Sequence, residues 1–350
     1  MFEPNSHSQW QIGWKPVSTE YSAEIMQLLH AYYGATGILS VELVDEWQQA
    51  SHNYRIFCEM GGERRSILIR KNILARLSEI EAGNDVMEHL QKCGIPVPLV
   101  IPAYDGHRMV NYHGSYWQVF EFITGDHFRG EANELEQAAC LLARMHQAFD
   151  SYPRKKKVPS IDSVLAPLSN DHWNDAIHLP GYNAFERMVF ERRTRIQEEI
   201  DRISRAFSTV YLSEAIIHGD VHPQNFLFRC GHLAAVLDFG VMCLADRWYD
   251  IAMALHRLVR QYVVHQKKPW QETLKEGIRI FIEAYASVNP LNRQQIDLLP
   301  LFAKAHLLRK MAYGYSLYRT GRRDWKEALS QFQKFFAFFD EIDAIQSMLV

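Results

Sequence analysis

The stretch IHGDVHPQN, residues 217–225, places two histidines, an aspartate and an asparagine within nine positions. On an extended segment alternate side chains point to the same side, so His218, Asp220 and His222 could present two imidazoles and a carboxylate to one metal ion. That spacing suits a zinc hydrolase that activates water. The alternative is a phosphate-transfer site in which only some of these residues take part in the chemistry.

The residues downstream predict a β-hairpin with polar side chains at its open end. Two short apolar runs, residues 226–228 and 233–237, flank the turn sequence RCGH. Because antiparallel strands bring their outer ends together, we expect Asn225 and Asp238 to lie side by side, with Asp220 just upstream on the same loop. Three oxygen-bearing side chains are therefore predicted to converge.

These oxygens favour phosphate transfer over the zinc hydrolase. An amide and a carboxylate are hard ligands that suit Mg²⁺, whereas zinc would prefer the histidines. In phosphoryl transfer one Asp accepts or orients the hydroxyl proton, while an Asn and a second Asp hold the metal. Asp220, Asn225 and Asp238 match these roles in order, and His218 and His222 are then expected to steady the loop.

Residues 218–225 and 237–240, HGDVHPQN and LDFG, resemble the H-G-D-x-H-x-x-N motif and the metal-binding Asp segment of the aminoglycoside phosphotransferase and choline kinase superfamily. The stretch ADRWYDIA, residues 245–252, is similar to the family's G-D-P-x-x-D-L-A segment, although Ala245 and Arg247 replace its usual Gly and Pro. The resemblance covers most of the chain. It implies an α+β, two-lobed protein-kinase-like fold with a small β-rich N-lobe and a larger, mainly helical C-lobe.

The same resemblance implies a function. It indicates transfer of the γ-phosphate of ATP, with GTP as the alternative donor, to a hydroxyl of a small molecule such as an amino alcohol, a hydroxy amino acid, a sugar or an aminoglycoside. Asp220 would be the catalytic base or hydroxyl orienter, and Asn225 and Asp238 would be the Mg²⁺ ligands. The helical regions from Asp150 to Phe207 and from Leu255 onward are expected to line the acceptor pocket, but they carry no motif that identifies the acceptor.

Sequence patterning agrees with two unequal lobes. Before residue 123, short strand-like runs dominate, and Gly61-Gly62 lies between two of them as a strong hairpin signal. After Gly125 long helical patterns prevail, including one predicted over residues 182–207. We therefore expect residues 1–122 to form the nucleotide-binding lobe and residues 123–350 the lobe that carries the catalytic loop and the acceptor site.

The first lobe should supply the nucleotide contacts. The family places a basic residue at the end of its second covering strand, where Arg70 and Lys71 compete, because adjacent strand residues face opposite sides and only one can point at phosphates. Glu81, with Glu79 next, is the expected carboxylate partner of that cation. The segment from Glu121 to Ile123 is expected to form the hinge whose backbone meets the adenine.

Composition limits the partners and the compartment. A formal net charge of −3 argues against a surface built to bind nucleic acid. Five scattered cysteines without C-x-x-C spacing suggest neither disulfides nor a cysteine zinc site, which fits a reducing cytoplasm. The N-terminus does not read as a signal peptide and no apolar run reaches the length of a membrane span, so no membrane partner is expected. Oligomeric state stays open.

Three other interpretations remain beside the small-molecule kinase. A protein Ser/Thr kinase of the same superfamily would use the same residues, but residues 46–53 contain no glycine, unlike the glycine-rich loop of protein kinases. A pseudokinase would bind nucleotide without turnover. The third is the zinc hydrolase built on His218, Asp220 and His222.

Overall fold

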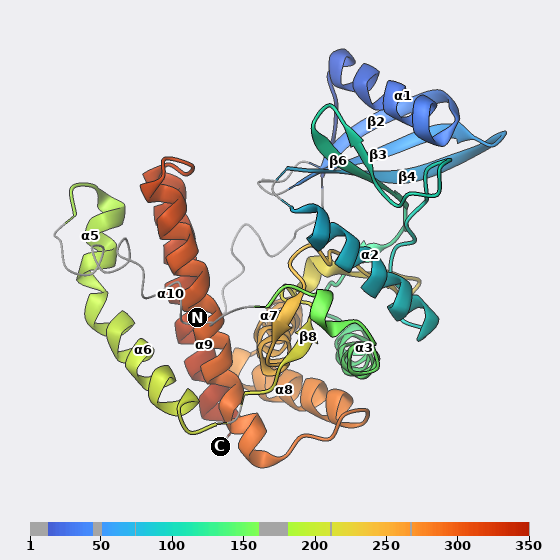
Figure 1. Ribbon diagram of the computed structural model, residues 1–350. Coiled ribbons are helices and arrows are strands. Elements are labelled where there is room, and N and C mark those ends of the chain that lie inside the picture. The colour runs from blue at the N-terminus through green and yellow to red at the C-terminus, as the bar shows by residue number, and fades with distance from the viewer. Residues whose placement is uncertain are drawn as a thin grey trace.

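The computed structural model describes residues 13–44, 51–73, 75–160, 181–210, 212–266 and 268–349. Two bodies of secondary structure are visible in Figure 1, one dominated by a sheet and one by helices. The α+β fold with a β-rich N-terminal part and a helical C-terminal part is confirmed.

The N-terminal body is a six-stranded antiparallel sheet with strand order β1-β2-β3-β4-β6-β5. Helix α1 lies across it, and α2 follows β4 (Figure 1). The hairpin predicted at Gly61-Gly62 is confirmed, since both glycines have positive φ, 60° and 80°, and join β3 to β4. The bounds are β1 Trp14–Pro16, α1 Thr19–Tyr33, β2 Ala35–Val44, β3 Ser51–Met60, β4 Glu63–Asn72, α2 Leu77–Lys92, β5 Val110–Tyr112 and β6 Ser115–Glu121.

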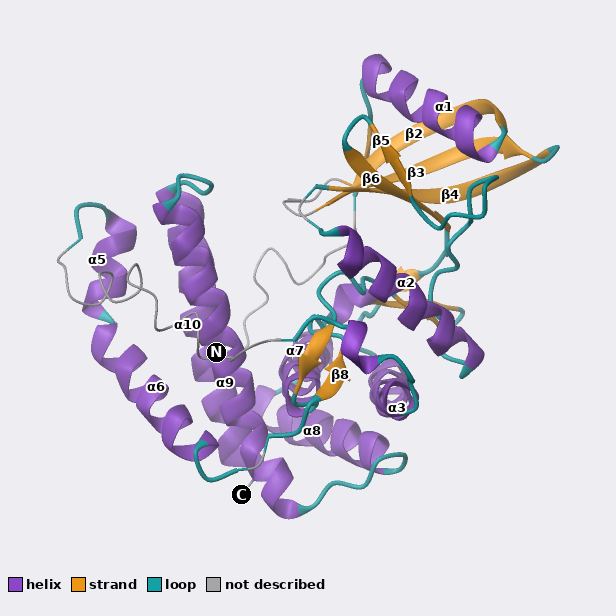
Figure 2. Ribbon diagram, in the orientation of Figure 1, coloured by secondary structure: helices purple, strands orange, loops and turns teal. Residues whose placement is uncertain are grey.

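The C-terminal body consists of helices around two small sheets, ordered β10-β9-β7 and β11-β8 (Figure 2). Its first elements are β7 Asp126–His127, α3 Ala132–Asp150, α5 Ala184–Glu191, α6 Arg193–Phe207, β8 Ala215–Ile217, β9 Phe226–Arg229, β10 His232–Val236 and β11 Cys243–Ala245. Four helices follow, α7 Trp248–Gln266, α8 Trp270–Ala286, α9 Arg293–Arg319 and α10 Trp325–Leu349. Two short 3₁₀ turns, η1 Lys155–Lys157 and η3 Pro223–Asn225, complete it.

One helix predicted from the sequence is broken in the structure. The pattern over residues 182–207 forms two helices, α5 and α6, that meet at Arg192. The first packs against α10 and the second against α9, so the chain changes direction between them to keep each apolar face covered. The expectation of one continuous helix is therefore wrong, although the helical residues are the ones predicted.

Two hydrophobic cores hold the bodies together. The smaller core lies between α1 and the sheet and includes Ile25, Leu29, Tyr54 and Trp117. The larger core fills the helical body and also takes in residues of α2 such as Leu90. Helix α2 thus belongs to the N-terminal sequence but packs on the C-terminal core, and the division of the chain at residue 122 stays a prediction.

Two expectations from composition can be compared with the described residues. All five cysteines are free thiols. Among the described helices, none is both long enough and apolar enough to cross a membrane.

Candidate active site

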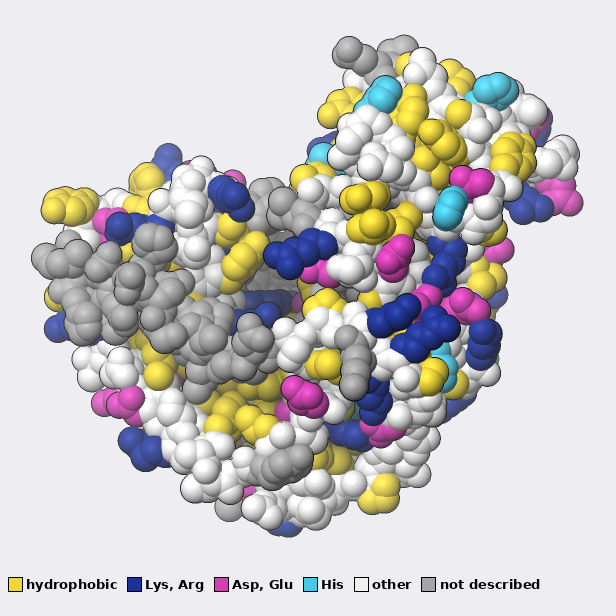
Figure 3. Space-filling model, in the orientation of Figure 1, with side chains coloured by type: hydrophobic (Ala, Val, Ile, Leu, Met, Phe, Trp, Pro, Cys, Tyr) yellow, Lys and Arg dark blue, Asp and Glu magenta, His cyan; other side chains and the backbone are white. Residues whose placement is uncertain are grey.

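A large cleft, with a volume of about 1920 Å³, lies between the sheet and the helical body. Strands β4 and β6, helix α2, the loop after β8, the β9–β10 hairpin and helices α7, α9 and α10 all contribute side chains to it. Figure 3 shows the hollow between the two bodies, with Lys and Arg side chains near it. Clefts of this kind are the favoured place for a small-molecule site.

The loop after β8 is held rigidly in the floor of this cleft. Asp250, at the start of α7, is fully buried, and its carboxylate accepts the backbone N–H of His218 at 2.7 Å and of Gly219 at 2.8 Å. Gly219 has φ +80°, and a Cβ there would lie 2.8 Å from the carbonyl oxygen of Val241. Only glycine fits this position, and Asp250 braces the loop.

The His218 side chain holds the loop in place through hydrogen bonds to the backbone. Its Nε2–H donates to the carbonyl oxygen of Leu237 at 2.8 Å, and its Nδ1 accepts the backbone N–H of Asp220 at 3.3 Å. Both ring nitrogens are therefore occupied and neither points at a common centre with His222. No group of three His, Cys, Asp or Glu side chains within the described residues is arranged to hold a metal ion. The geometry of the zinc hydrolase is absent from the loop.

Asp220 is the carboxylate that the loop presents to the cleft. Lys310, from α9, lies 3.1 Å from its Oδ1, and the Nε2 of His222 lies 3.2 Å from its Oδ2. Burial raises the pKa of Asp220, but the charges of Lys310 and His222 and their hydrogen bonds outweigh it and hold the pKa well below its ordinary value. Asp220 is consequently ionised at neutral pH.

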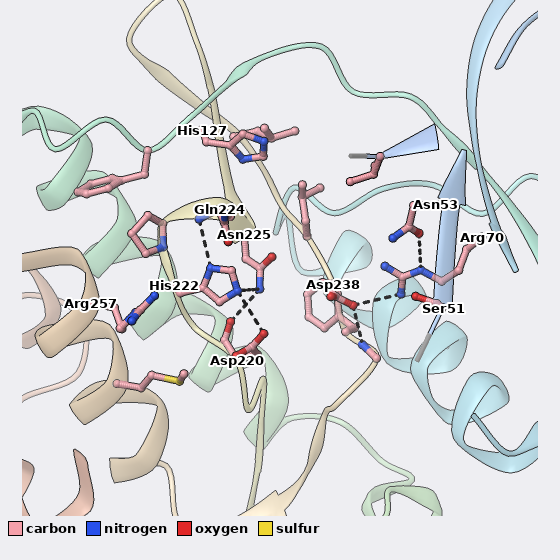
Figure 4. Close-up of a pocket in the computed structure, with 18 of the residues that line it drawn as sticks. Ser51, Asn53, Arg70, His127, Asp220, His222, Gln224, Asn225, Asp238 and Arg257 are labelled. Atoms are coloured by element: carbon pink, nitrogen blue, oxygen red, sulfur yellow. Dashed lines mark hydrogen bonds and ion pairs between the residues drawn. The ribbon is translucent and has the colours of Figure 1, made fainter. Parts of the chain in front are cut away.

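Asn225 and Asp238 lie side by side at the open end of the β9–β10 hairpin, as predicted. The backbone N–H of Leu237 donates to the carbonyl oxygen of Asn225 at 2.8 Å. The amide nitrogen of Asn225 donates to the carbonyl oxygen of Asp220 at 2.8 Å, which leaves its Oδ1 as the oxygen free to meet a ligand. Figure 4 shows Asp220, Asn225 and Asp238 facing one another across the cleft floor.

These oxygens fit a hard divalent cation. Asp238 has φ +62°, unusual for a residue other than glycine, and its carboxylate is about half exposed to the cleft. An exposed carboxylate and a neighbouring amide oxygen are the ligands that Mg²⁺ accepts while it keeps several waters. The donor set is thus chemically suitable for Mg²⁺ at Asn225 and Asp238.

The structure separates the two candidate cations on β4. Arg70 faces the cleft, where its Nη1 lies 3.1 Å from Oδ1 of Asp238 and its Nε donates to Oδ1 of Asn53 at 3.0 Å (Figure 4). Lys71 points to the other face of the sheet, where its Nζ lies 3.5 Å from Glu24 and 4.7 Å from the centre of the Trp117 ring. Arg70 is therefore the strand cation that can reach a ligand in the cleft.

Glu81 does not pair with Arg70, which corrects the expectation from the sequence. The face of α2 that lines the cleft carries Glu79, Ile80 and Gly83, and Glu81 lies on the opposite, exposed side. Glu79 accepts the backbone N–H of Arg76 at 2.9 Å and so caps its own helix. The carboxylate that Arg70 contacts is instead Asp238, at 3.1 Å.

The expected hinge lies where β6 leaves the sheet. Glu121 and Ile123 both line the cleft. The backbone N–H of Glu121 donates to the carbonyl oxygen of Leu99 at 2.9 Å, so it is already used. The N–H of Ile123 donates no hydrogen bond within the described residues, which leaves it available to a flat heterocycle.

The far wall of the cleft comes from α7, α9 and α10. For this part of the chain, the sequence indicated only that residues from Leu255 onward would line the acceptor pocket. No described residue between 150 and 207 lines the cleft, although that region was also expected there. Lys310 was missed altogether. A single lysine on a long amphipathic helix carries no signal of its own, and only the packing of α9 brings it to Asp220.

The comparisons with known proteins agree with this geometry. The model of the phosphotransferase enzyme family matches residues 48–291, and the chain belongs to that family. A homoserine kinase of Rhizobium meliloti (strain 1021) is 28% identical over 229 residues, which cover 64% of this chain and 64% of that relative. The match thus spans somewhat less than two thirds of the relative's length.

Solved structures of low sequence identity share the fold. An amicoumacin kinase, in complex with AMP-PNP, Ca²⁺ and Ami, superimposes with a TM-score of 0.69 at 15% identity. The match covers 93% of this chain and 96% of that structure's chain. A microcompartment-associated aminopropanol kinase gives a TM-score of 0.67 at 17% identity, with the same shares of each chain covered.

Proposed function

We propose that the protein transfers the γ-phosphate of ATP, with GTP as the alternative, to a hydroxyl of a small molecule. The observation that carries this proposal is the convergence of Asp220, Asn225 and Asp238 in one cleft opposite Arg70. Each is the residue type that phosphoryl transfer needs at that place. The family membership and the nucleotide analogue bound to the amicoumacin kinase support the donor.

Asp220 is the base in this proposal. Its ionised carboxylate accepts the proton of the acceptor hydroxyl while the oxygen forms a bond to the γ-phosphorus and the bond from that phosphorus to the β-phosphate oxygen breaks. Lys310 stabilises negative charge beside Asp220, and Arg70 contacts the phosphates once a nucleotide enters between it and Asp238. Mg²⁺, held by Asn225 and Asp238, would neutralise phosphate charge. The gain in rate comes from positioning and charge.

The acceptor belongs to the small hydroxyl compounds. The relatives and neighbours with printed activities are kinases of homoserine, aminopropanol and an antibiotic, each a small molecule. The protein-kinase interpretation is tested by comparing labelled phosphate transfer into metabolite pools and into protein extracts.

The role of Asp220 is tested with Asp220→Asn. This change keeps the shape of the side chain but removes the base, so turnover should fall at least 1000-fold while the calorimetric affinity for a non-hydrolysable ATP analogue stays within about threefold. Asp150→Asn, an exposed aspartate outside the cleft, is the matched control. Full turnover by Asp220→Asn would contradict the assignment, and nucleotide binding by a wild-type protein that phosphorylates nothing would favour the pseudokinase.

The nucleotide side is tested by comparing Arg70→Met with Lys71→Met. Both remove one positive charge from neighbouring positions of β4, but only Arg70 faces the cleft. We expect the KM for ATP to rise about 10- to 100-fold in Arg70→Met and to change less than threefold in Lys71→Met. A larger rise of the KM for ATP in Lys71→Met than in Arg70→Met would show that Arg70 is not the strand residue that contacts the phosphates.

A further inference from the structure

The wall of the cleft formed by α7, α9, α10 and the α9–α10 turn is strongly basic. Among the described residues that line this wall, Glu327 is the only acidic one. Six cationic side chains accompany it: Arg257, Arg260, Lys310, Arg323, Lys326 and Lys334. A wall of this charge is suited to an anion and unsuited to a polyamine.

Arg260 and Lys310 each have a carboxylate partner. The guanidinium of Arg260 contacts Glu341 at 3.0 Å, and Lys310 contacts Asp220 at 3.1 Å. Arg257 and Lys334 have none, since no carboxylate within the described residues lies within ion-pair distance of either. The guanidinium of Arg257 lies instead 4.9 Å from the centre of the Phe338 ring.

Holding these two cations close together is costly. Burial lowers the pKa of Lys334, and the nearby charge of Arg257 lowers it further. Burial and the charge of Arg260 also lower the pKa of Arg257, and they outweigh the more distant charges of Asp220 and Glu341, which raise it. His306 also lines the cleft. Its buried Nε2 makes no hydrogen bond among the described residues, although buried polar atoms usually have a partner.

The position of this pair assigns it to the acceptor. In Figure 4 Arg257 and Arg70 lie on opposite sides of Asp220 and His222, so the phosphates of a nucleotide beside Arg70 and Asp238 do not occupy the Arg257 side. The base lies between the two sides. An acceptor whose hydroxyl meets Asp220 from the far side extends toward Arg257.

We propose that Arg257 and Lys334 bind an acidic group of the acceptor, a carboxylate or a phosphate, so that the substrate is an anionic hydroxy compound. The proposal rests on the proposed phosphotransferase function and narrows its substrate class. An acceptor recognised only through ammonium groups, as an amino alcohol or an aminoglycoside would be, finds a repelling wall at this place.

The proposed anion site can be tested with four acceptors that differ in which charged groups they carry. L-Homoserine carries a carboxylate and an ammonium, 4-hydroxybutanoate only the carboxylate, 3-aminopropan-1-ol only the ammonium, and glycerol 3-phosphate a phosphate. Transfer of labelled phosphate from ATP gives kcat/KM for each, and calorimetry with a non-hydrolysable ATP analogue gives binding without turnover. We expect at least one anionic acceptor to exceed 3-aminopropan-1-ol by tenfold or more, and the phosphate arm tells which acidic group is preferred.

Variants connect the selectivity to the two residues. Arg257→Gln and Lys334→Gln should each lower the ratio of kcat/KM for the anionic acceptor to that for 3-aminopropan-1-ol by roughly 10- to 150-fold, the range for one lost charge-assisted hydrogen bond. Arg257→Lys should recover part of it. Arg279→Gln, which removes an exposed charge on α8 outside the cleft, should leave the ratio unchanged. If circular dichroism shows that Arg257→Gln does not fold, the ratio measured for Lys334→Gln tests the proposal.

The outcomes separate the two proposals. A preference for 3-aminopropan-1-ol, an unchanged ratio in the folded variants, or no binding of any anionic acceptor would overturn the anion site. Anion binding that Lys334→Gln weakens, in a protein that transfers phosphate to no acceptor, would support the anion site and overturn the phosphotransferase.

Discussion

Asp250 offers the sharpest test of how the loop is held, because it acts only through other residues. Its carboxylate is fully buried and accepts two short backbone hydrogen bonds, from His218 at 2.7 Å and from Gly219 at 2.8 Å. A third contact joins it to Nε2 of His146 at 3.3 Å. It therefore fixes the two residues that immediately precede Asp220.

Asp250→Asn keeps the size of the side chain and removes the charge. One carboxylate oxygen becomes an NH₂ group, so one backbone N–H loses its acceptor, which costs about 1–3 kcal/mol. The other hydrogen bond loses its charge assistance, about 1 kcal/mol more, and the lower cost of burying a neutral group offsets part of the sum. We expect the free energy of unfolding to fall by about 2–4 kcal/mol.

The loop should also shift, and with it the base. A displacement of Asp220 by about 1 Å is expected to lower kcat about 100-fold, with a smaller effect on the KM for ATP. Urea denaturation measures the stability, and steady-state kinetics below the transition measure the activity. Asp150→Asn, the same chemical change at an exposed ion pair with Arg247, should alter unfolding by less than about 0.5 kcal/mol.

Two results would refute the reasoning. A loss of stability below about 0.5 kcal/mol would mean that the two short hydrogen bonds do not hold the loop. A destabilised Asp250→Asn protein with an unchanged kcat would mean that the loop does not position Asp220.

Gly219→Ala should cost about 3 kcal/mol in unfolding free energy, because it adds a clash 2.8 Å from the Val241 carbonyl oxygen to the strain of φ +80°. Gly231→Ala, with φ +75° and open space around the added Cβ, should cost about 1 kcal/mol, and equal losses would argue against the clash. Lys310→Gln removes one of the two neighbours that lower the pKa of Asp220, so this pKa should rise and the acid limb of the kcat/KM profile should move to higher pH. Coincident profiles would contradict this.

The catalytic loop and its hairpin were predictable because their contacts are local. Asn225 and Asp238 meet through the pairing of β9 with β10, and a two-strand hairpin follows from apolar runs around a short turn. The hairpin at Gly61-Gly62 was readable for the same reason. What failed in the N-lobe was Glu81, because each step along α2 rotates the side chain by about 100°, so two residues after Glu79 the side chain points away from the cleft.

The sequence by itself determined the two-lobed α+β fold and the chemistry of the loop, because residue types at fixed short spacing specify turns and the ligands they carry. Tertiary structure alone decided that Arg70 and not Lys71 enters the cleft, that Lys310 contacts Asp220, and that Arg257 and Lys334 line the same cleft. Those cations come from three different helices, α7, α9 and α10. Helical periodicity shows which face is apolar, but only packing shows what the other face meets.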